Sequence, residues 1–179
     1  MKQKQKKAVL VKLVQSLQKR GSWCGETHIQ KATYCLQEIT GVPLEFDFIL
    51  YKHGPFSFDL REELTTMRAY KFIEIKINPY PYGPSLTITE KAEDLMERFP
   101  MTLGKFNSQI SFIAEKLGDK GVAELERLAT ALYVTKDKGK IDINERASII
   151  NELKPHVSLT AANEALQEID EILSCSSGI

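Results

Sequence analysis

The chain has 179 residues, of which 42% are hydrophobic and 27% are charged, and its formal net charge at pH 7 is zero. This composition is typical of a folded globular protein and excludes an intrinsically disordered chain. Zero net charge excludes a general electrostatic attraction to nucleic acid. No apolar run approaches the ~18 residues of a membrane span, so we expect a cytoplasmic protein that has no membrane partner.

Two amphipathic helices are expected near the N-terminus. Apolar side chains recur every three or four positions in residues 4–19 and again in residues 26–39, which is the period of one helical face. Gly21 ends the first helix, and Gly41 followed by Pro43 ends the second. We therefore expect each helix to bury one stripe of side chains.

A short strand is expected next. Residues 46–51 alternate between two faces at period two, which predicts a half-buried strand. Gly54 and Pro55 end this pattern. We expect them to form a tight corner from the strand into a helix, with Phe56 and Phe58 anchored in the core.

The following elements complete the outline of a winged helix. A third helix is capped by Ser57 and carries Leu60, Leu64 and Met67 on one face, so we expect these three side chains to be buried. Residues 72–88 contain two β-branched runs around a segment rich in proline and tyrosine, which predicts a hairpin. The order helix, helix, strand, helix and hairpin is that of a winged helix, with the hairpin as its wing.

The second half of the chain is expected to be helical. Thr89 caps a fourth helix, and apolar stripes continue through four further helices. A polar loop is expected at residues 135–140 and a loose tail at residues 174–179. The expected fold class is mainly α with a small β-hairpin (α+β). It comprises a winged-helix domain in residues 1–100 and a helical C-terminal region in residues 101–179.

A winged helix commonly binds DNA, with its third helix in a major groove and its wing over the backbone. The candidate nucleic-acid-binding residues are Lys4, Lys6, Lys7, Lys52, His53, Arg61, Thr65 and Arg68. Lys52 and His53 are included because they lie close to the start of the third helix, whose N-terminus favours phosphate. The N-terminal lysines equally suit a solvated helix face. Asp59, Glu62 and Glu63 on the third helix oppose the binding of a polyanion.

A protein partner is the alternative. Tyr80 and Tyr82 form a candidate aromatic patch of the kind enriched at protein interfaces, and no lysine or arginine lies between residues 78 and 84. The expected partners are therefore double-stranded DNA or a protein, with a homodimer as a further option. Convergence of Lys52, Arg61, Arg68 and the N-terminal lysines on one face would favour DNA, whereas interruption by acids would favour a protein.

The sequence offers no catalytic or metal-binding constellation. Cys24 and His28 lie one helical turn apart, but structural zinc sites normally show two tight ligand pairs, and only Cys35 and His53 could complete this one. Packed side chains are the favoured interpretation. Three cysteines, with Cys175 the last, do not form a disulfide framework. We expect no metal, no cofactor and no enzymatic activity.

A resemblance to the YwgA-like protein family rests on three motifs. They are Gly25-Glu26-Thr27-His28-Ile29-Gln30-Lys31-Ala32-x-Tyr34, Tyr51-Lys52-His53-Gly54-Pro55-Phe56-Ser57 and Tyr82-Gly83-Pro84. A looser likeness to the Panacea domain of antitoxins rests on Gln30-Lys31-Ala32-Thr33-Tyr34 and on residues 51–55, with His53 at an intervening position. The close resemblance covers about the first hundred residues and implies a winged-helix-like fold without assigned catalytic residues. The looser one implies a role in regulation or in neutralising a partner.

Overall fold

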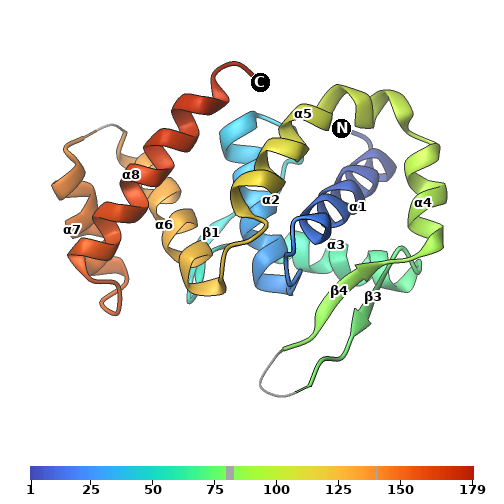
Figure 1. Cartoon of the computed structure of the whole chain (residues 1–179), viewed down its shortest axis with the longest axis horizontal. Coiled ribbons are helices and arrows are strands. Elements are labelled where there is room, and N and C mark those ends of the chain that lie inside the picture. The colour runs from blue at the N-terminus through green and yellow to red at the C-terminus, as the bar shows by residue number, and fades with distance from the viewer. Residues whose placement is uncertain (80–82, 140) are drawn as a thin grey trace.

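Helices make up most of the protein, and two short antiparallel strand pairs complete it (Figure 1). The computed structural model describes residues 1–79, 83–139 and 141–179. The described helices are α1 (Gln3–Lys19), α2 (Glu26–Thr40), α3 (Phe58–Ala69), α4 (Glu90–Glu97), α5 (Pro100–Leu117), α6 (Val122–Lys138), α7 (Ile143–Leu153) and α8 (Leu159–Ser176). The strands are β1 (Ile49–Tyr51), β2 (Gly54–Phe56), β3 (Ile73–Lys76) and β4 (Ser85–Ile88). The expected fold class, mainly α with a small β-hairpin, is confirmed. No described helix is long and apolar enough to cross a membrane.

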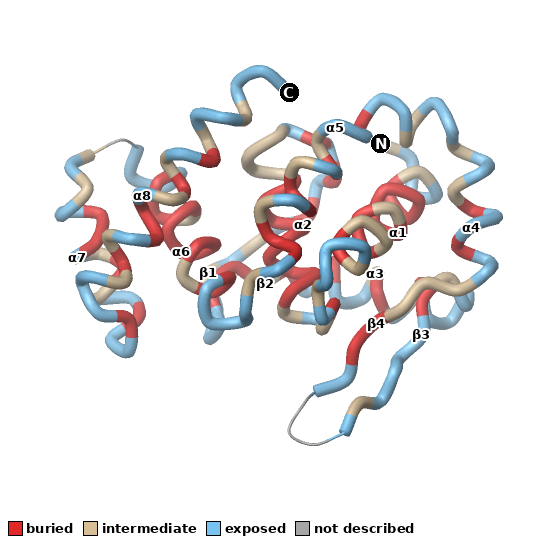
Figure 2. The backbone as a smooth tube through the Cα atoms, in the orientation of Figure 1, coloured by how far each residue is buried: buried red, intermediate tan, exposed pale blue. Residues whose placement is uncertain are grey.

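Helix α2 runs through the middle of the protein and contacts α1, α5, α6 and strand β2 (Figure 1). All residues from 28 to 36 are buried, including the polar side chains of Gln30 and Lys31. Figure 2 shows the same concentration of buried residues along α1 and α2. The sequence predicted that α2 buries only one stripe of side chains, but the buried surface of α2 is wider. Apolar periodicity indicates one face of a helix, whereas other elements cover α2 on several faces.

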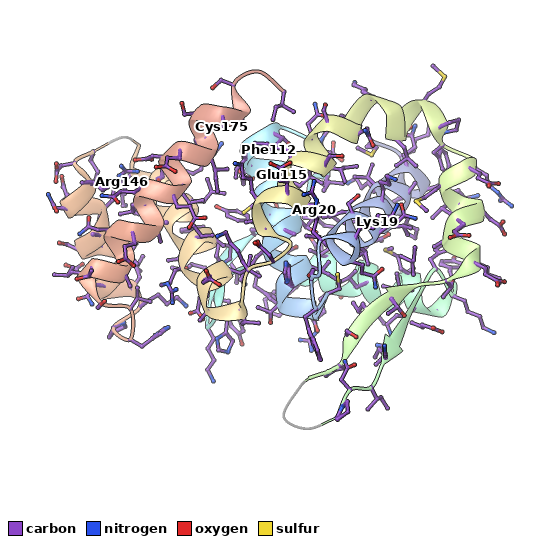
Figure 3. The ribbon with its side chains drawn as sticks, viewed as in Figure 1. Lys19, Arg20, Phe112, Glu115, Arg146 and Cys175 are labelled. Atoms are coloured by element: carbon purple, nitrogen blue, oxygen red, sulfur yellow. The ribbon has the colours of Figure 1, made fainter. Side chains whose placement is uncertain are left out.

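The C-terminal helices pack on the N-terminal ones and share one core with them. Helix α5 lies along α1, and α6 packs on α2. The apolar side chains of all four helices belong to the same buried cluster. At the end of α1, Arg20 lies 3.6 Å from Glu115 of α5. Figure 3 labels both side chains. Gly118 permits this close approach, because a Cβ atom there would lie 2.4 Å from the Cβ of Arg20.

A second hairpin, β1–β2, stands where a direct corner from strand to helix was expected. Burial alternates along residues 46–51 as expected, but only the last three of them form strand β1. The chain turns at Lys52 and His53, and Gly54, with a φ of +85°, begins a second strand that pairs back on the first. The hairpin was missed because Pro55 has no amide hydrogen to donate and usually marks the end of a strand.

Phe58 is not anchored in the core, contrary to the expectation. Its side chain is 50% exposed, and Phe56 is only partly buried. The rings of Phe56, Phe58 and Tyr51 pack on one another instead, with centroids 5.1 to 5.9 Å apart. Tilted and edge-on ring contacts of this kind are favourable. The β1–β2 hairpin and the first residue of α3 therefore share a small aromatic cluster at the surface.

Helix α3 and the β3–β4 hairpin follow the sequence prediction. Ser57 caps α3, since its Oγ accepts a hydrogen bond from the backbone N of Leu60 at 3.2 Å. Leu60, Leu64 and Met67 are all buried. Strands β3 and β4 pair in antiparallel register, and the hairpin extends away from the helices beside α3 (Figure 1).

Three details of the later helices differ from expectation. The Thr89 side chain does not cap α4, because its hydroxyl donates to the carbonyl oxygen of Lys71. Helix α6 continues through the first part of the expected polar loop and ends at Lys138. Helix α8 continues to Ser176, into the tail that was expected to be loose. In the last two cases a local polar composition concealed a regular backbone.

Candidate functional site

A groove with a volume of about 1030 Å³ runs between helix α3 and the β3–β4 hairpin. Its floor is apolar: Ile73 is buried, Ile88 is partly buried, and Ile75 is 41% exposed. Its rim carries charges of both signs on exposed side chains. The charged residues that line the groove are Arg68, Lys71, Glu74, Glu90 and Lys91.

Three of the candidate DNA-binding residues lie together at this groove. Thr65 and Arg68 line it, and both also line an adjoining hollow of about 200 Å³ together with Arg61. Arg61 Nε lies 3.4 Å from an oxygen of Glu26 on α2. The structure therefore brings the α3 candidates into one concave surface, with an acid beside the first of them.

Lys6 and Lys7 lie elsewhere, and each pairs with a carboxylate of another segment. Lys6 Nζ is 2.8 Å from Glu45, and Lys7 Nζ is 2.5 Å from Glu63, which joins α1 to α3. The two lysines are only 8% and 9% exposed. The hydrogen bond and charge of Lys6 lower the pKa of the Glu45 carboxyl group. Only Lys4 remains exposed among the three N-terminal candidates. The expectation of a free basic arm is corrected for Lys6 and Lys7, whose partner carboxylates come from distant segments.

Lys52 and His53 lie at a second place, in the turn of the β1–β2 hairpin. His53 Nδ1 is 3.4 Å from Glu126 of α6, which lies 73 residues further along the chain. The Lys154 amine donates to the carbonyl oxygens of Tyr51 and Lys52 at 2.5 and 2.6 Å. Sequence reasoning missed Glu126 and Lys154. No local pattern connects segments so far apart in the chain.

The candidate basic residues therefore do not converge on one face. Lys52 and His53 belong to the β1–β2 hairpin, whereas Thr65 and Arg68 belong to the groove beside α3. Carboxylates stand next to four of the eight candidates, as the ion pairs of Lys6, Lys7, His53 and Arg61 show. The candidate protein-interaction residues Tyr80 and Tyr82 lie outside the described residues.

The cysteines and histidine of the weak metal motif are packed against the core. Burial raises the pKa of the Cys24 and Cys35 thiols. Burial also lowers the pKa of His28, whose ring nitrogens lie 2.9 Å from Ser22 Oγ and 2.9 Å from the carbonyl oxygen of Leu117. Within the part of the chain that the structure describes, no three histidine, cysteine or acidic side chains are arranged to hold a metal ion.

Comparison with known proteins does not assign the chain to a family. No protein-family model matches it, and no curated protein matches it significantly.

Proposed function

We propose that the protein is a non-catalytic protein-interaction module of the winged-helix type, and that its interface is the groove between α3 and the β3–β4 hairpin. The observation that carries the proposal is the lining of this groove, which has an apolar floor and a rim with charges of both signs. Protein interfaces share this organisation, with an apolar centre surrounded by polar residues. A segment of a partner protein that presents apolar side chains between opposite charges would fit it.

The order of elements supports the winged-helix part of the proposal. Helices α1 and α2 precede α3, and the β3–β4 hairpin follows α3 directly and lies beside it. The motif resemblance to the YwgA-like family agrees with this order, and the likeness to the Panacea domain agrees with a role in holding or neutralising a protein.

The charges near the groove favour a protein partner over a polyanion. Three basic and two acidic side chains line the groove, so a row of phosphates would meet Glu74 and Glu90 as well as the cations. On α3 itself, Asp59 and Glu62 are exposed close to the N-terminal end. Lys6 and Lys7 cannot supplement the basic residues, because both are buried and paired with carboxylates, Lys6 with the exposed Glu45 and Lys7 with the largely buried Glu63.

Site-specific photo-crosslinking in cells that produce the protein tests the proposal. A photoreactive residue in place of Ile75 should give a discrete protein adduct, and Arg68→Glu should abolish it. The matched control is Leu159, whose 50% exposure is close to the 41% of Ile75 and which does not line the groove. Equal adducts at both positions, or none at Ile75, would contradict the interface.

DNA binding remains a second candidate, favoured by the exposure of Thr65 and Arg68 beside the hairpin. A mobility-shift titration of duplex DNA at two salt concentrations tests it. If the protein contacts phosphates, the logarithm of the binding constant should fall with the logarithm of the salt concentration, with a slope of about −0.9 for each phosphate contacted. Arg68→Ala should weaken binding to a preferred sequence by about 1 to 3 kcal/mol if the side chain contacts a base. Absence of retardation at low salt would rule this candidate out. A dimer in sedimentation would support it, since paired half-sites suit two-fold symmetry.

A further inference from the structure

A second pocket, of about 770 Å³, lies where three distant segments of the chain meet. The turn of the β1–β2 hairpin contributes Lys52 and His53, α6 contributes Glu126, and the α7–α8 connection contributes Lys154 and His156. Its volume falls in the range that is usual for small-molecule sites. The pocket shares no lining residue with the groove beside α3.

A single buried carboxylate lies between the two histidines of this pocket and is hydrogen-bonded to one of them, His53. The Glu126 side chain is only 9% exposed. Its Oε2 lies 3.4 Å from His53 Nδ1, and its Oε1 lies 3.2 Å from His156 Nε2. The two imidazole rings are 59% and 62% exposed. Among the described residues, neither His53 Nε2 nor His156 Nδ1 has a hydrogen-bond partner, so each ring keeps one nitrogen for a ligand.

The charge of Glu126 is already balanced without the histidines. Lys154 Nζ lies 3.8 Å from Glu126 and is itself buried. Lys31 of α2 is buried and donates to the carbonyl oxygen of Pro55 at 2.8 Å. Burial lowers the pKa of Lys31 to about 8, and the opposing attraction of Glu126 is the next largest influence. Two amines therefore face one carboxylate, and Lys52 adds a third cation at the rim.

We propose that this pocket binds a small phosphate-bearing anion through His53, His156 and Lys52. Four basic residues line the pocket, two from the β1–β2 turn and two from the α7–α8 connection, and Glu126 is the only acid among its described lining residues. A phosphate group accepts several charge-assisted hydrogen bonds at once, so it matches donors that converge from separate segments. A metal ion fits less well, because the imidazoles contact opposite oxygens of Glu126 and no metal-holding group is present in the described part of the chain.

Titration with inorganic phosphate, followed by the imidazole signals in an NMR spectrum, tests the proposal. Ionic strength is held constant with chloride. The signals of His53 and His156 should shift in a saturable way with phosphate, while those of His28 should stay unchanged, because His28 is 3% exposed and lies in the core. The same shifts with chloride alone would show that no specific site exists and would overturn the proposal.

Variants separate the pocket from other basic surfaces. The double variant His53→Gln and His156→Gln should weaken phosphate binding by about tenfold or more, which corresponds to at least one charge-assisted hydrogen bond. Both side chains are largely exposed, so the variant should fold normally. Lys91→Gln, at the rim of the other groove, is the matched control and should leave the affinity unchanged.

A final comparison distinguishes the source of the phosphate. A phosphomonoester such as a nucleoside monophosphate should compete with inorganic phosphate for the same signals. A response to an oligonucleotide without any response to inorganic phosphate or a monophosphate would overturn the proposal, because it would indicate an extended nucleic-acid surface. Undiminished phosphate binding in the double variant would overturn it as well.

Discussion

Gln30 of α2 holds both polar backbone atoms of Ser57. Its Nε2 donates to the Ser57 carbonyl oxygen at 2.9 Å, and its Oε1 accepts from the Ser57 amide at 2.9 Å. Gln37, seven residues later and therefore on the same face of α2, binds Phe46 in the same way, at 3.0 and 2.9 Å. The two glutamines hold residues 46–57 against α2, and so fix the point at which α3 begins.

Replacing Gln30 by leucine should lower the free energy of unfolding by about 2 kcal/mol, because it leaves the buried amide of Ser57 without a partner, whereas the Ser57 carbonyl oxygen keeps the Arg61 amide as a donor. Gln37→Leu is the control. Gln37 is only partly buried, so water can replace more of its bonds with Phe46 and the loss should be smaller. Urea denaturation measures both, and equal losses would contradict the role of burial at Ser57.

The contrast between these glutamines and the apolar stripes explains how far the sequence could predict the fold. Leu60 and Leu64 were correctly placed in the core, because apolar residues at helical spacing have one favourable location. Gln30 and Lys31 were not, because a polar residue in a helix is normally exposed. Their burial depends on backbone groups of a later segment, which local periodicity does not report.

The candidate sites show the same limit. The surface beside α3 could be foreseen, since Thr65 and Arg68 are neighbours on one helix face and the hairpin follows directly. The association of His53 with Glu126 and His156 could not, because it requires knowing how α6 and the α7–α8 connection pack on the β1–β2 hairpin. Likewise, charge counts near the N-terminus gave no indication that Lys7 has a partner on α3.

Lys7 was a candidate DNA-binding residue because the N-terminal segment is rich in lysine. Its pairing with Glu63 predicts that it stabilises the fold instead. Lys7→Met should lower the free energy of unfolding by about 3 kcal/mol, because Glu63, with 13% of its side chain exposed, loses its partner. Adding Glu63→Leu should restore most of the loss, since an apolar pair removes the desolvated charge. Lys4→Met, at an exposed position, should change stability by less than about 0.5 kcal/mol. A double variant no more stable than Lys7→Met would contradict the ion-pair explanation.

Leu64 tests whether the buried face of α3 contributes to the core as its position indicates. The side chain is 4% exposed, so Leu64→Ala should cost about 2 to 5 kcal/mol through lost transfer energy and the cavity that remains. Ile77→Ala is the control, because Ile77 is 87% exposed and its truncation should have little effect. Thermal and urea unfolding measure the difference. A similar small effect for both variants would mean that α3 is not packed on the core.

Lys31 makes stability depend on pH in the alkaline range. Burial is the main reason that its pKa falls from 10.5 to about 8, and attraction to Glu126 opposes the fall. Between these two values the unfolded chain keeps a proton that the folded protein has released, so this group makes the free energy of unfolding rise with pH. Below about pH 8 both states are protonated, and the cost of burying the charged amine is fully present.

Comparison of the protein with Lys31→Met isolates this contribution. The free energy of unfolding of the unchanged protein, relative to that of the variant, should rise by about 2 kcal/mol between pH 7.5 and pH 10. Tyr34 and Cys35 act in the opposite direction, because burial raises the pKa of both, but they are present in both proteins and largely cancel in the difference. Urea denaturation at the two pH values measures the change. A difference that stays constant would mean that the folded protein keeps Lys31 charged throughout, and that Glu126 and the carbonyl oxygen of Pro55 compensate fully for its burial.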